Sequence, residues 1–535
     1  MSAAATRALP AAAASSAAFN PWLIAVLVAF ASFMENLDTT IANVALPYVA
    51  GGLGVSEDEA SWVITTYLVA NAVSLTASSY LAQRVGRKSF FLTCLALFTA
   101  SSVLCGFAPN LQALLLFRIL QGLGGGGMVP VAQSILADTF PPEKRGQAFA
   151  LFGIAVVVAP VVGPTLGGWI SDNWSWQWCF EINGPIGLLA LALLAVMLRD
   201  SDAAVAERKR FVRQGTDFDL VGFALAATFL GALELALDRG LEDDWFGSNF
   251  IIATVALCAL AFVMLIPWEL SRRNPIIDVR IVATRQFGAC FLVMLATGAI
   301  LLSTTQYLPQ LVQAEYGYTA TWAGFVLSPG GVVLALMMPV AGRLSGKVQP
   351  HILIAIGAAI CALAMFDMTR INGQVDFRFF AMSRMFLSVG LPFVFIPILT
   401  ASFAGIPHNK TDMASALINV ARNTGGSIGI SLANNVLAHR EQFHQSRLVE
   451  LVNTSTVQFQ AAMKQATDYF LTQGHSLGQA QQQAIGWIAH QVQTQSAFLA
   501  YIDVFWVLML ISAAAVPLAL TLRKVKLGGP APIAH

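Results

Sequence analysis

Apolar segments of membrane-spanning length follow one another along almost the whole chain, and this pattern limits the fold more than any other feature. Apolar residues make up 56% of the sequence and charged residues only 11%, whereas about a quarter of the residues in a soluble domain are charged. A run of roughly 20 apolar residues crosses the hydrocarbon core as one helix. Fourteen such segments occur, at residues 21–47, 60–82, 89–108, 111–137, 147–171, 182–199, 218–237, 250–269, 286–312, 320–341, 351–368, 377–403, 412–438 and 498–522. We therefore expect an all-α integral membrane protein with 14 transmembrane helices.

Lysine and arginine are distributed unevenly between the two sets of loops. If the N-terminus is cytoplasmic, the cytoplasmic loops hold 21 of the 30 basic residues, the outer loops hold six and the segments themselves hold three. Basic residues accumulate in cytoplasmic loops of membrane proteins. An even number of segments returns the chain to the side on which it starts. Both termini are therefore predicted to be cytoplasmic.

Two carboxylates, Glu35 and Asp38, lie near the middle of the first segment. A charge inside the bilayer is costly and is retained where it faces a cavity or a partner. The two residues are three positions apart, so they share one helix face and repel each other when both are ionised. A membrane carboxylate that gains and loses a proton couples transport to a proton gradient. We expect Asp38 to carry this coupling, with Glu35 either a second proton site or an attraction for cationic substrates.

Arg118 lies in the middle of the fourth segment. An arginine at this depth needs a carboxylate, a carbonyl group or water as its partner. Asp38 is the predicted partner across a helix interface, and the alternative is a structural arginine bonded to backbone carbonyls. If the pair forms, protonation of Asp38 from outside weakens it and favours one conformation, and release of the proton inside restores it.

Two further motifs suit a protein that changes conformation. Arg84, Gly86 and Arg87 fill the short cytoplasmic turn between the second and third segments, where glycine permits a tight turn and the basic groups can bond carbonyls or carboxylates. Small residues and a proline, which allow close helix approach and bending, recur in the fifth segment. They are Gly163, Pro164, Gly167 and Gly168.

Together these motifs resemble the major facilitator superfamily, and within it the fourteen-helix drug:proton antiporters of the EmrB/QacA type. The matching segments are residues 37–47, 81–87, 118–122, 163–168, 178–187 and 219–222. The segment 486–491 is similar to the Gram-negative EmrB branch, and the resemblance covers residues 20–525. Several positions depart from the family pattern. Glu234 is an acid where relatives are often neutral, and its place near the outer end of its segment favours an ordinary structural role. Gln83 stands where the loop motif has an acidic residue, which puts the cytoplasmic contact of that loop in question, and Glu35 is an additional acid.

The resemblance implies the major facilitator fold, with two six-helix bundles and two extra helices. The implied division is a cytoplasmic tail 1–20, an N-terminal bundle 21–199, a cytoplasmic linker 200–217, the extra helices with their connecting loop 218–285, a C-terminal bundle 286–522 and a tail 523–535. Within the C-terminal bundle, residues 439–497 form an external, periplasmic segment that is rich in Gln and Ala. It is either a solvated loop or, because 59 residues without structure are unusual, a pair of amphipathic helices at 458–470 and 477–493.

The function that the resemblance implies is proton-coupled export of amphipathic drugs or toxic organic compounds across the bacterial inner membrane. The substrate pocket is expected at the midplane between the two bundles. Its candidate polar lining is Asn43, Gln133, Gln306, Tyr307, Gln310, Asn419 and Asn423. The implied partners are protons, membrane lipid, a periplasmic adaptor of the EmrA type and an outer-membrane channel. The alternative cargo is an endogenous metabolite such as a fatty acid or a siderophore.

Other functions find little support in the sequence. No phosphate-binding loop of the G-x-x-x-x-G-K-[ST] type occurs, so the proton gradient is the expected energy source and no cofactor is expected. The seven histidines form no H-E-x-x-H or clustered set, and no G-x-S-x-G occurs, so neither a metal site nor an integral membrane enzyme is expected. There is no basic patch that would indicate a nucleic-acid partner.

Overall fold

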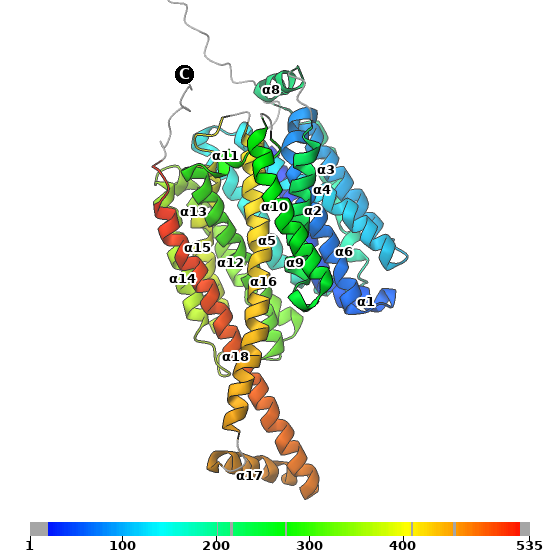
Figure 1. Cartoon of the computed structure of the whole chain (residues 1–535), viewed down its shortest axis with the longest axis vertical. Helices are drawn as coiled ribbons and strands as arrows, with labels where there is room; N and C mark the ends of the chain where they lie inside the picture. The colour runs from blue at the N-terminus through cyan, green and yellow to red at the C-terminus, as the bar shows by residue number, and fades with distance from the viewer. Residues whose placement is uncertain are drawn as a thin grey trace, which may run out of the picture.

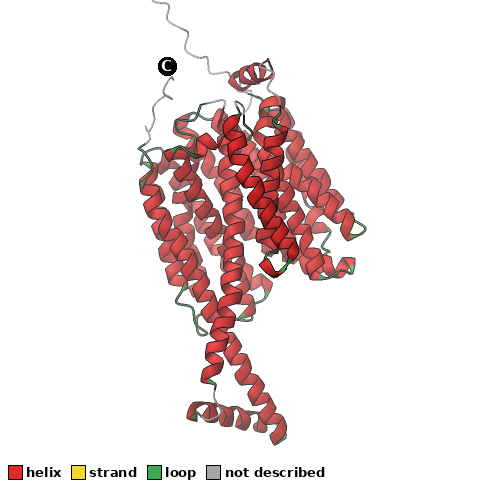
Figure 2. Cartoon of the chain, viewed as in Figure 1, coloured by secondary structure: helices red, strands yellow, loops and turns green. Residues whose placement is uncertain are grey.

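The computed structural model describes residues 20–200, 202–213, 218–272, 275–407, 410–452 and 456–524, and within these ranges it contains helices and no strands (Figure 2). Of the predicted tails, residues 1–19 and 525–535 lie outside the described part, as do 201 and 214–217 of the linker.

The N-terminal helices follow the predicted segments closely. They are α1 (Pro21–Leu53), α2 (Glu57–Val85), α3 (Arg87–Gly106), α4 (Leu111–Thr139), α5 (Pro142–Asn173), α6 (Trp178–Glu181) and α7 (Asn183–Met197), and α6 and α7 together form the sixth crossing. A further helix, α8 (Asp202–Arg213), occupies most of the predicted linker. The extra helices are α9 (Leu220–Arg239) and α10 (Asn249–Ser271), with the short helix η1 (Trp245–Gly247) between them.

The C-terminal helices include the two longest of the described chain. They are α11 (Val279–Val282), α12 (Arg285–Ala314), α13 (Ala320–Ser345), α14 (Pro350–Met368), α15 (Phe377–Ser402), α16 (Thr411–Leu451), α17 (Val457–Thr472) and α18 (Leu477–Leu520). The predicted segment 439–497 is thus built from the end of α16, all of α17 and the start of α18. These parts project from one end of the bundle, while α8 lies at the opposite end (Figure 1). We name the α8 end cytoplasmic and the α17 end external, following the charge bias of the loops.

Local sequence explains where several helices begin. Ser56 and Glu59 form a reciprocal capping box at the start of α2, and Ser476 and Gln479 form another at the start of α18. The side chain of Asn110 accepts a hydrogen bond from the backbone of Ala113 at the start of α4. These caps satisfy backbone donors at helix starts that have no partner within the helix.

The helices pack as two bundles joined along two seams. In the first bundle α1 packs against α5 and α2 against α4, and in the second α12 packs against α16 and α13 against α15. The bundles meet where α5 contacts α13 and where α16 contacts α2 and α4. The extra helix α9 packs against α10, α2 and α16, so it lies along the second seam (Figure 1).

Thirteen helices of the described chain are long and apolar enough to cross a membrane. The fourteenth predicted segment, 412–438, lies within α16, whose polar residues leave it outside this group. The all-helical fold is as expected, and the count of 14 crossings stays a prediction.

Glycine allows the closest helix contacts. A Cβ atom on Gly163 of α5 would overlap the side chain of Thr40 on α1, and one on Gly425 of α16 would overlap the backbone of Leu295 on α12. Both bundles therefore depend on glycine at a crossing point.

We predict that Gly425→Ala lowers the stability of the folded bundle by about 1–3 kcal/mol, because the added methyl group forces α12 and α16 apart. The measurement is the apparent melting temperature of the purified protein in detergent. Gly486→Ala is the matched control: Gly486 lies in the external part of α18 with no atom within 4 Å of an added Cβ, and alanine favours helix. Equal melting temperatures for the two variants would contradict the prediction.

Candidate functional site

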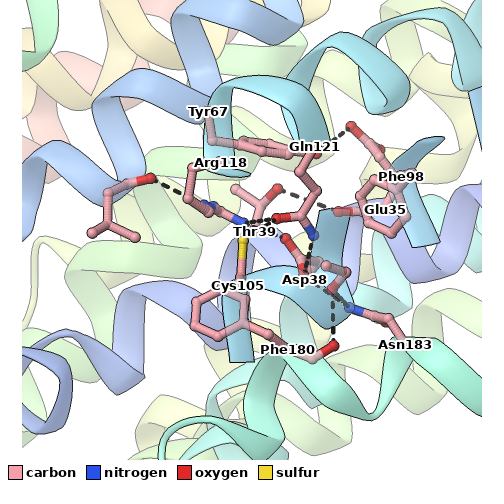
Figure 3. Close-up of polar contacts among 12 residues, drawn as sticks. Glu35, Asp38, Thr39, Tyr67, Phe98, Cys105, Arg118, Gln121, Phe180 and Asn183 are labelled. Atoms are coloured by element: carbon pink, nitrogen blue, oxygen red, sulfur yellow. Dashed lines mark hydrogen bonds and ion pairs between the residues drawn. The ribbon is translucent and has the colours of Figure 1, made fainter. Parts of the chain in front are cut away.

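The side chain of Asp38 accepts three hydrogen bonds inside the N-terminal bundle (Figure 3). Arg118 Nη1 lies 2.7 Å from Oδ2, and Gln121 Nε2 and Asn183 Nδ2 each lie 2.8 Å from Oδ1. None of the four residues is more than 2% exposed. The network joins α1, α4 and α7, and one cation offsets the charge of this carboxylate.

The guanidinium of Arg118 is held on several sides. Its Nε donates to the backbone oxygen of Val63 at 3.0 Å, and Nη1 also donates to Gln121 Oε1 at 2.7 Å. The group lies 4.3 Å from the ring centre of Tyr67 and 5.4 Å from that of Phe180, within the range of cation–π attraction. Both sequence-based readings of Arg118 therefore apply, because it pairs with Asp38 and also bonds a backbone carbonyl.

Glu35 is 7% exposed and is bound by neutral donors. Its Oε1 accepts from Asn71 Nδ2 at 3.0 Å and from the Tyr67 hydroxyl at 3.3 Å, and its Oε2 accepts from Asn36 Nδ2 at 2.8 Å. Tyr67 thus connects the two acids, since its hydroxyl bonds Glu35 while its ring covers Arg118.

The C-terminal bundle brings a positive charge towards Glu35. Arg422 of α16 is 8% exposed and interacts electrostatically with Glu35. The guanidinium also donates from Nε and Nη2 to Asn423 Oδ1, at 3.2 and 3.1 Å. The two acids of α1 therefore differ in their surroundings: Asp38 bonds only to its own bundle, whereas Glu35 faces a charge from the other.

An ion-pair cluster joins the bundles at the cytoplasmic end. Arg87, 6% exposed at the start of α3, binds both carboxylate oxygens of Asp412 on α16, with Nε–Oδ1 at 2.8 Å and Nη2–Oδ2 at 3.1 Å. It also pairs with Asp138 of α4. Gln83, the position that departs from the family motif, donates to Ser79 instead. The cross-bundle contact therefore forms without an acid at position 83.

The rest of the loop motif positions this cluster. Gly86 has a φ of 99°, a backbone conformation that favours glycine, and it is the single residue between the end of α2 and the start of α3. Arg84 is exposed; its Nη1 donates to the Tyr80 hydroxyl at 2.6 Å, and its carbonyl accepts from Arg208 of α8. In the fifth helix, Gly167 lies against Ile41 of α1, as Gly163 lies against Thr40. Pro164 lies between these two glycines inside α5, and Gly168 approaches Val44 more loosely.

The candidate substrate residues fall into two groups. Gln133 and Asn419 meet across the bundles, with Asn419 Nδ2 and Ser415 Oγ each 2.8 Å from Gln133 Oε1. The Tyr307 hydroxyl donates to the backbone oxygen of Ile430 and bonds Asn434, so it is committed to packing within the C-terminal bundle. Asn43, Gln306 and Gln310 are exposed, and Asn423 is half-buried.

Sequence reasoning assigned no role to several residues of these contacts. Asp138 and Asp412 lie at the ends of helices, where an acid is unremarkable without knowledge of Arg87. Asn183 lay within a recognised motif, yet only the fold brings it to Asp38. Arg384 of α15 is 1% exposed and donates to Thr304 and Thr305 of α12, and its depth in an apolar segment was the available signal.

Comparison with known proteins agrees with this architecture. The model of the Major Facilitator Superfamily matches residues 28–430. The chain belongs to the major facilitator superfamily. It is 37% identical over 490 residues to the multidrug export protein EmrB of Escherichia coli K12, which covers 90% of this chain and 92% of the relative. It is 35% identical over 485 residues to the fatty acid resistance protein FarB of Neisseria gonorrhoeae, with the same coverage.

Solved structures show the same fold at low sequence identity. The proton:xylose symporter XylE has a TM-score of 0.57 and 14% identity, covering 93% of this chain and 96% of that one. The resemblance drawn from the motifs is confirmed, and the chain is a multi-pass membrane protein of a transporter family.

We predict that Asp412→Asn loosens the cytoplasmic contact between the bundles. Losing a charged hydrogen-bond acceptor costs about 2 kcal/mol, which shifts a two-state equilibrium roughly thirtyfold. Ser415→Cys supplies a reporter, because Ser415 is fully buried against α4. Maleimide should label this cysteine several-fold faster in the Asp412→Asn background.

The matched control is Glu143→Gln, which removes an exposed cytoplasmic acid at the start of α5. It should leave the labelling rate unchanged. Equal rates in the Asp412→Asn and unmodified backgrounds would show that the cluster does not hold the bundles together.

Proposed function

We propose that the protein exports amphipathic organic compounds across the bacterial inner membrane in exchange for protons, by alternating access between its two bundles. The observation that carries this proposal is the fully buried pair of Asp38 and Arg118 beside a second buried acid, Glu35, in a transporter fold. Ionisable groups in transmembrane helices mark ion and proton pathways. The relatives named as multidrug exporters support the direction of transport and the type of cargo.

The contacts favour Glu35 over Asp38 as the group whose protonation changes the conformation. A ligand shifts an equilibrium only if it binds the two states differently. The hydrogen-bond partners of Asp38 move with it in the N-terminal bundle, so a proton there leaves the contact between the bundles unchanged. A proton on Glu35 removes its attraction to Arg422 across the seam between the bundles. We propose that Glu35 carries the coupling proton and that the pair of Asp38 and Arg118 holds α1 in its orientation.

The driving force is sufficient for useful export. A proton that crosses 100 mV releases about 2.3 kcal/mol, and this supports a roughly fifty-fold substrate gradient per proton. Binding of substrate between the bundles, near Gln133 and Asn419, would then be coupled to proton release through α16, which carries both Asn419 and Arg422.

An endogenous amphipathic metabolite, such as a fatty acid or a siderophore, is the second candidate cargo. The similarity to a fatty acid resistance protein at 35% identity favours this reading as directly as the similarity to EmrB favours drugs. Both cargoes require the same coupling. Efflux of ethidium, an amphipathic cation, and of oleate, an amphipathic anion, with and without a protonophore separates them.

We predict that Glu35→Gln abolishes transport driven by a pH gradient while substrate exchange at equal pH continues, because the variant keeps its shape but carries no exchangeable proton. Asp38→Asn should abolish the driven transport as well, and it should lower stability by about 3–5 kcal/mol, because Arg118 is left buried without a counter-charge. The measurements are transport into proteoliposomes of known pH difference and the apparent melting temperature.

Glu57→Gln provides the control for both variants, since Glu57 is an exposed acid in the first turn of α2. It should transport and melt like the unmodified protein. Retention of gradient-driven transport by both Glu35→Gln and Asp38→Asn would exclude proton coupling through this site.

We further propose that the external hairpin, residues 439–497, binds a periplasmic adaptor of the EmrA type and so connects export to an outer-membrane channel. The hairpin presents exposed apolar side chains on its helices, among them Tyr469, Ile485 and Trp487. Where the hairpin leaves the bundle, Arg440 and His444 of α16 bind Asp503 of α18 at 2.5 and 2.8 Å. These ion pairs brace its base.

We predict that replacing residues 450–495 with a short Gly/Ser linker leaves membrane insertion and proteoliposome transport within about twofold of normal, because the braced base and the bundle are retained. Resistance of intact cells should be lost, since export would end in the periplasm. The measurements are vesicle transport and growth inhibition in the same host. Unchanged resistance would rule out docking by the hairpin.

A further inference from the structure

Glu234 is a buried acid outside the site formed by Asp38 and Glu35. It lies on the extra helix α9 and is 7% exposed. Ser427 Oγ of α16 donates to Glu234 Oε1 at 2.6 Å. The hydrogen bond therefore joins an extra helix to the C-terminal bundle.

The extra helix α9 is also bonded to the N-terminal bundle, through α2. Asp238, one turn beyond Glu234, bonds Thr65 of α2. Arg239 Nη1 donates to Ser61 Oγ at 2.6 Å, and its guanidinium lies 5.1 Å from the ring centre of Trp62. Because α9 is held to α2 at three neighbouring side chains, it should move with the N-terminal bundle.

This arrangement makes the contact of Glu234 depend on conformation. Alternating access moves α16 relative to α2, and α9 stays with α2. Ser427 must then approach or leave Glu234 during the cycle. A buried carboxylate that gains or loses a hydrogen-bond donor differs between the two states in the relative stability of its charged and neutral forms. Its protonation and the position of α16 are thereby linked.

We propose that Glu234 is a second proton-binding group of the transport cycle, and that its protonation is linked to the position of α16. The inference rests on the proposed proton-coupled transport and adds to it one group that lies outside the core bundles. In each binding event the carboxylate takes up one proton and loses its negative charge, and in each release event it returns that proton to water.

The surrounding charges are consistent with proton entry from the external side. On α9 itself, Asp238 is exposed one turn nearer to the external end, and Arg239 follows it. On α2 the nearest acid is Asp58, whose backbone oxygen accepts from Arg239. On α16 the nearest charge is Arg422, five positions before Ser427, and on α10 the acid Glu269 lies at the far, cytoplasmic end beside Gly222. Asp238 is thus the group that can pass protons between external water and Glu234.

A purely structural hydrogen bond is the competing explanation, and Glu234→Gln separates the two. Glutamine retains an oxygen that accepts from Ser427 but has no exchangeable acid proton. A structural role predicts normal behaviour for this variant. A proton-binding role predicts a changed response to pH in a protein that is still folded.

The test uses the Ser415→Cys reporter in the full-length protein in nanodiscs, without substrate, and follows maleimide labelling between pH 5.5 and 8. The proton is the only ligand varied. The rate at each pH is divided by that of free cysteine under the same conditions, because only the thiolate reacts and its fraction rises with pH. We expect this corrected rate to change several-fold over the range in the reporter protein, and Glu234→Gln to remove at least half of that change. Glu234→Asp keeps the acid and should restore most of the response.

Substitution of Ser427 tests the hydrogen bond itself. The carboxylic acid band of Glu234 in infrared spectra, identified by its absence in Glu234→Gln, should titrate with a midpoint that Ser427→Ala moves by about one pH unit. Ser427→Thr keeps a hydroxyl and should leave the midpoint in place. A normal labelling profile in Glu234→Gln, or one midpoint shared by Ser427→Ala and the unmodified protein, overturns the inference. Neither result affects the proposed function, which is decided by Glu35→Gln and Asp38→Asn.

Discussion

The pairing of Asp38 with Arg118 is the interaction on which the N-terminal bundle depends. Two charges withdrawn from water are costly, and the cost falls when they pair with each other and gain further hydrogen bonds. Gln121 and Asn183 complete the set for Asp38, so three helices are fixed around one ion pair. In the C-terminal bundle Arg384 binds the hydroxyl groups of Thr304 and Thr305. The acids for which we propose proton exchange lie on α1 and on the extra helix α9.

Within the described part of the chain, α16 of the C-terminal bundle supplies four polar interactions across the second seam. Asp412, Asn419 and Ser427 of α16 bond, in turn, Arg87, Gln133 and Glu234. Between the last two, Arg422 interacts electrostatically with Glu35. The four residues of α16 lie on one side of the helix, within about 140° around its axis. This polar face also explains why α16 is less apolar than the other predicted crossings. A shift of α16 would alter all four interactions together, from the cytoplasmic end to the external half of the membrane.

Prediction from sequence succeeded where a residue carries its own signal. Segment lengths located the helices, and the depth of Asp38 and Arg118 in apolar sequence was enough to predict that they need partners. Prediction failed where the role of a residue depends on a partner that is distant in the sequence. Asp412 is 325 positions from Arg87, and Glu234 resembled an ordinary acid near a helix end until Ser427 was found beside it. The bond of Tyr307 to Asn434 within its own bundle was likewise invisible in the sequence, and its place in the pocket stays a prediction.

The length of α16 has a mechanical consequence. This single helix of 41 residues runs from Asp412 at the cytoplasmic end to Leu451 in the external hairpin, a distance of about 60 Å at 1.5 Å per residue. A rod of this length behaves as a lever, so a small tilt inside the membrane becomes a larger sweep at its tip. The hairpin would then move with each change in the bundle, and a protein attached to it would in turn resist or favour each step. The change of the bundles within the membrane and the binding of a protein to the hairpin outside it would therefore be mechanically linked.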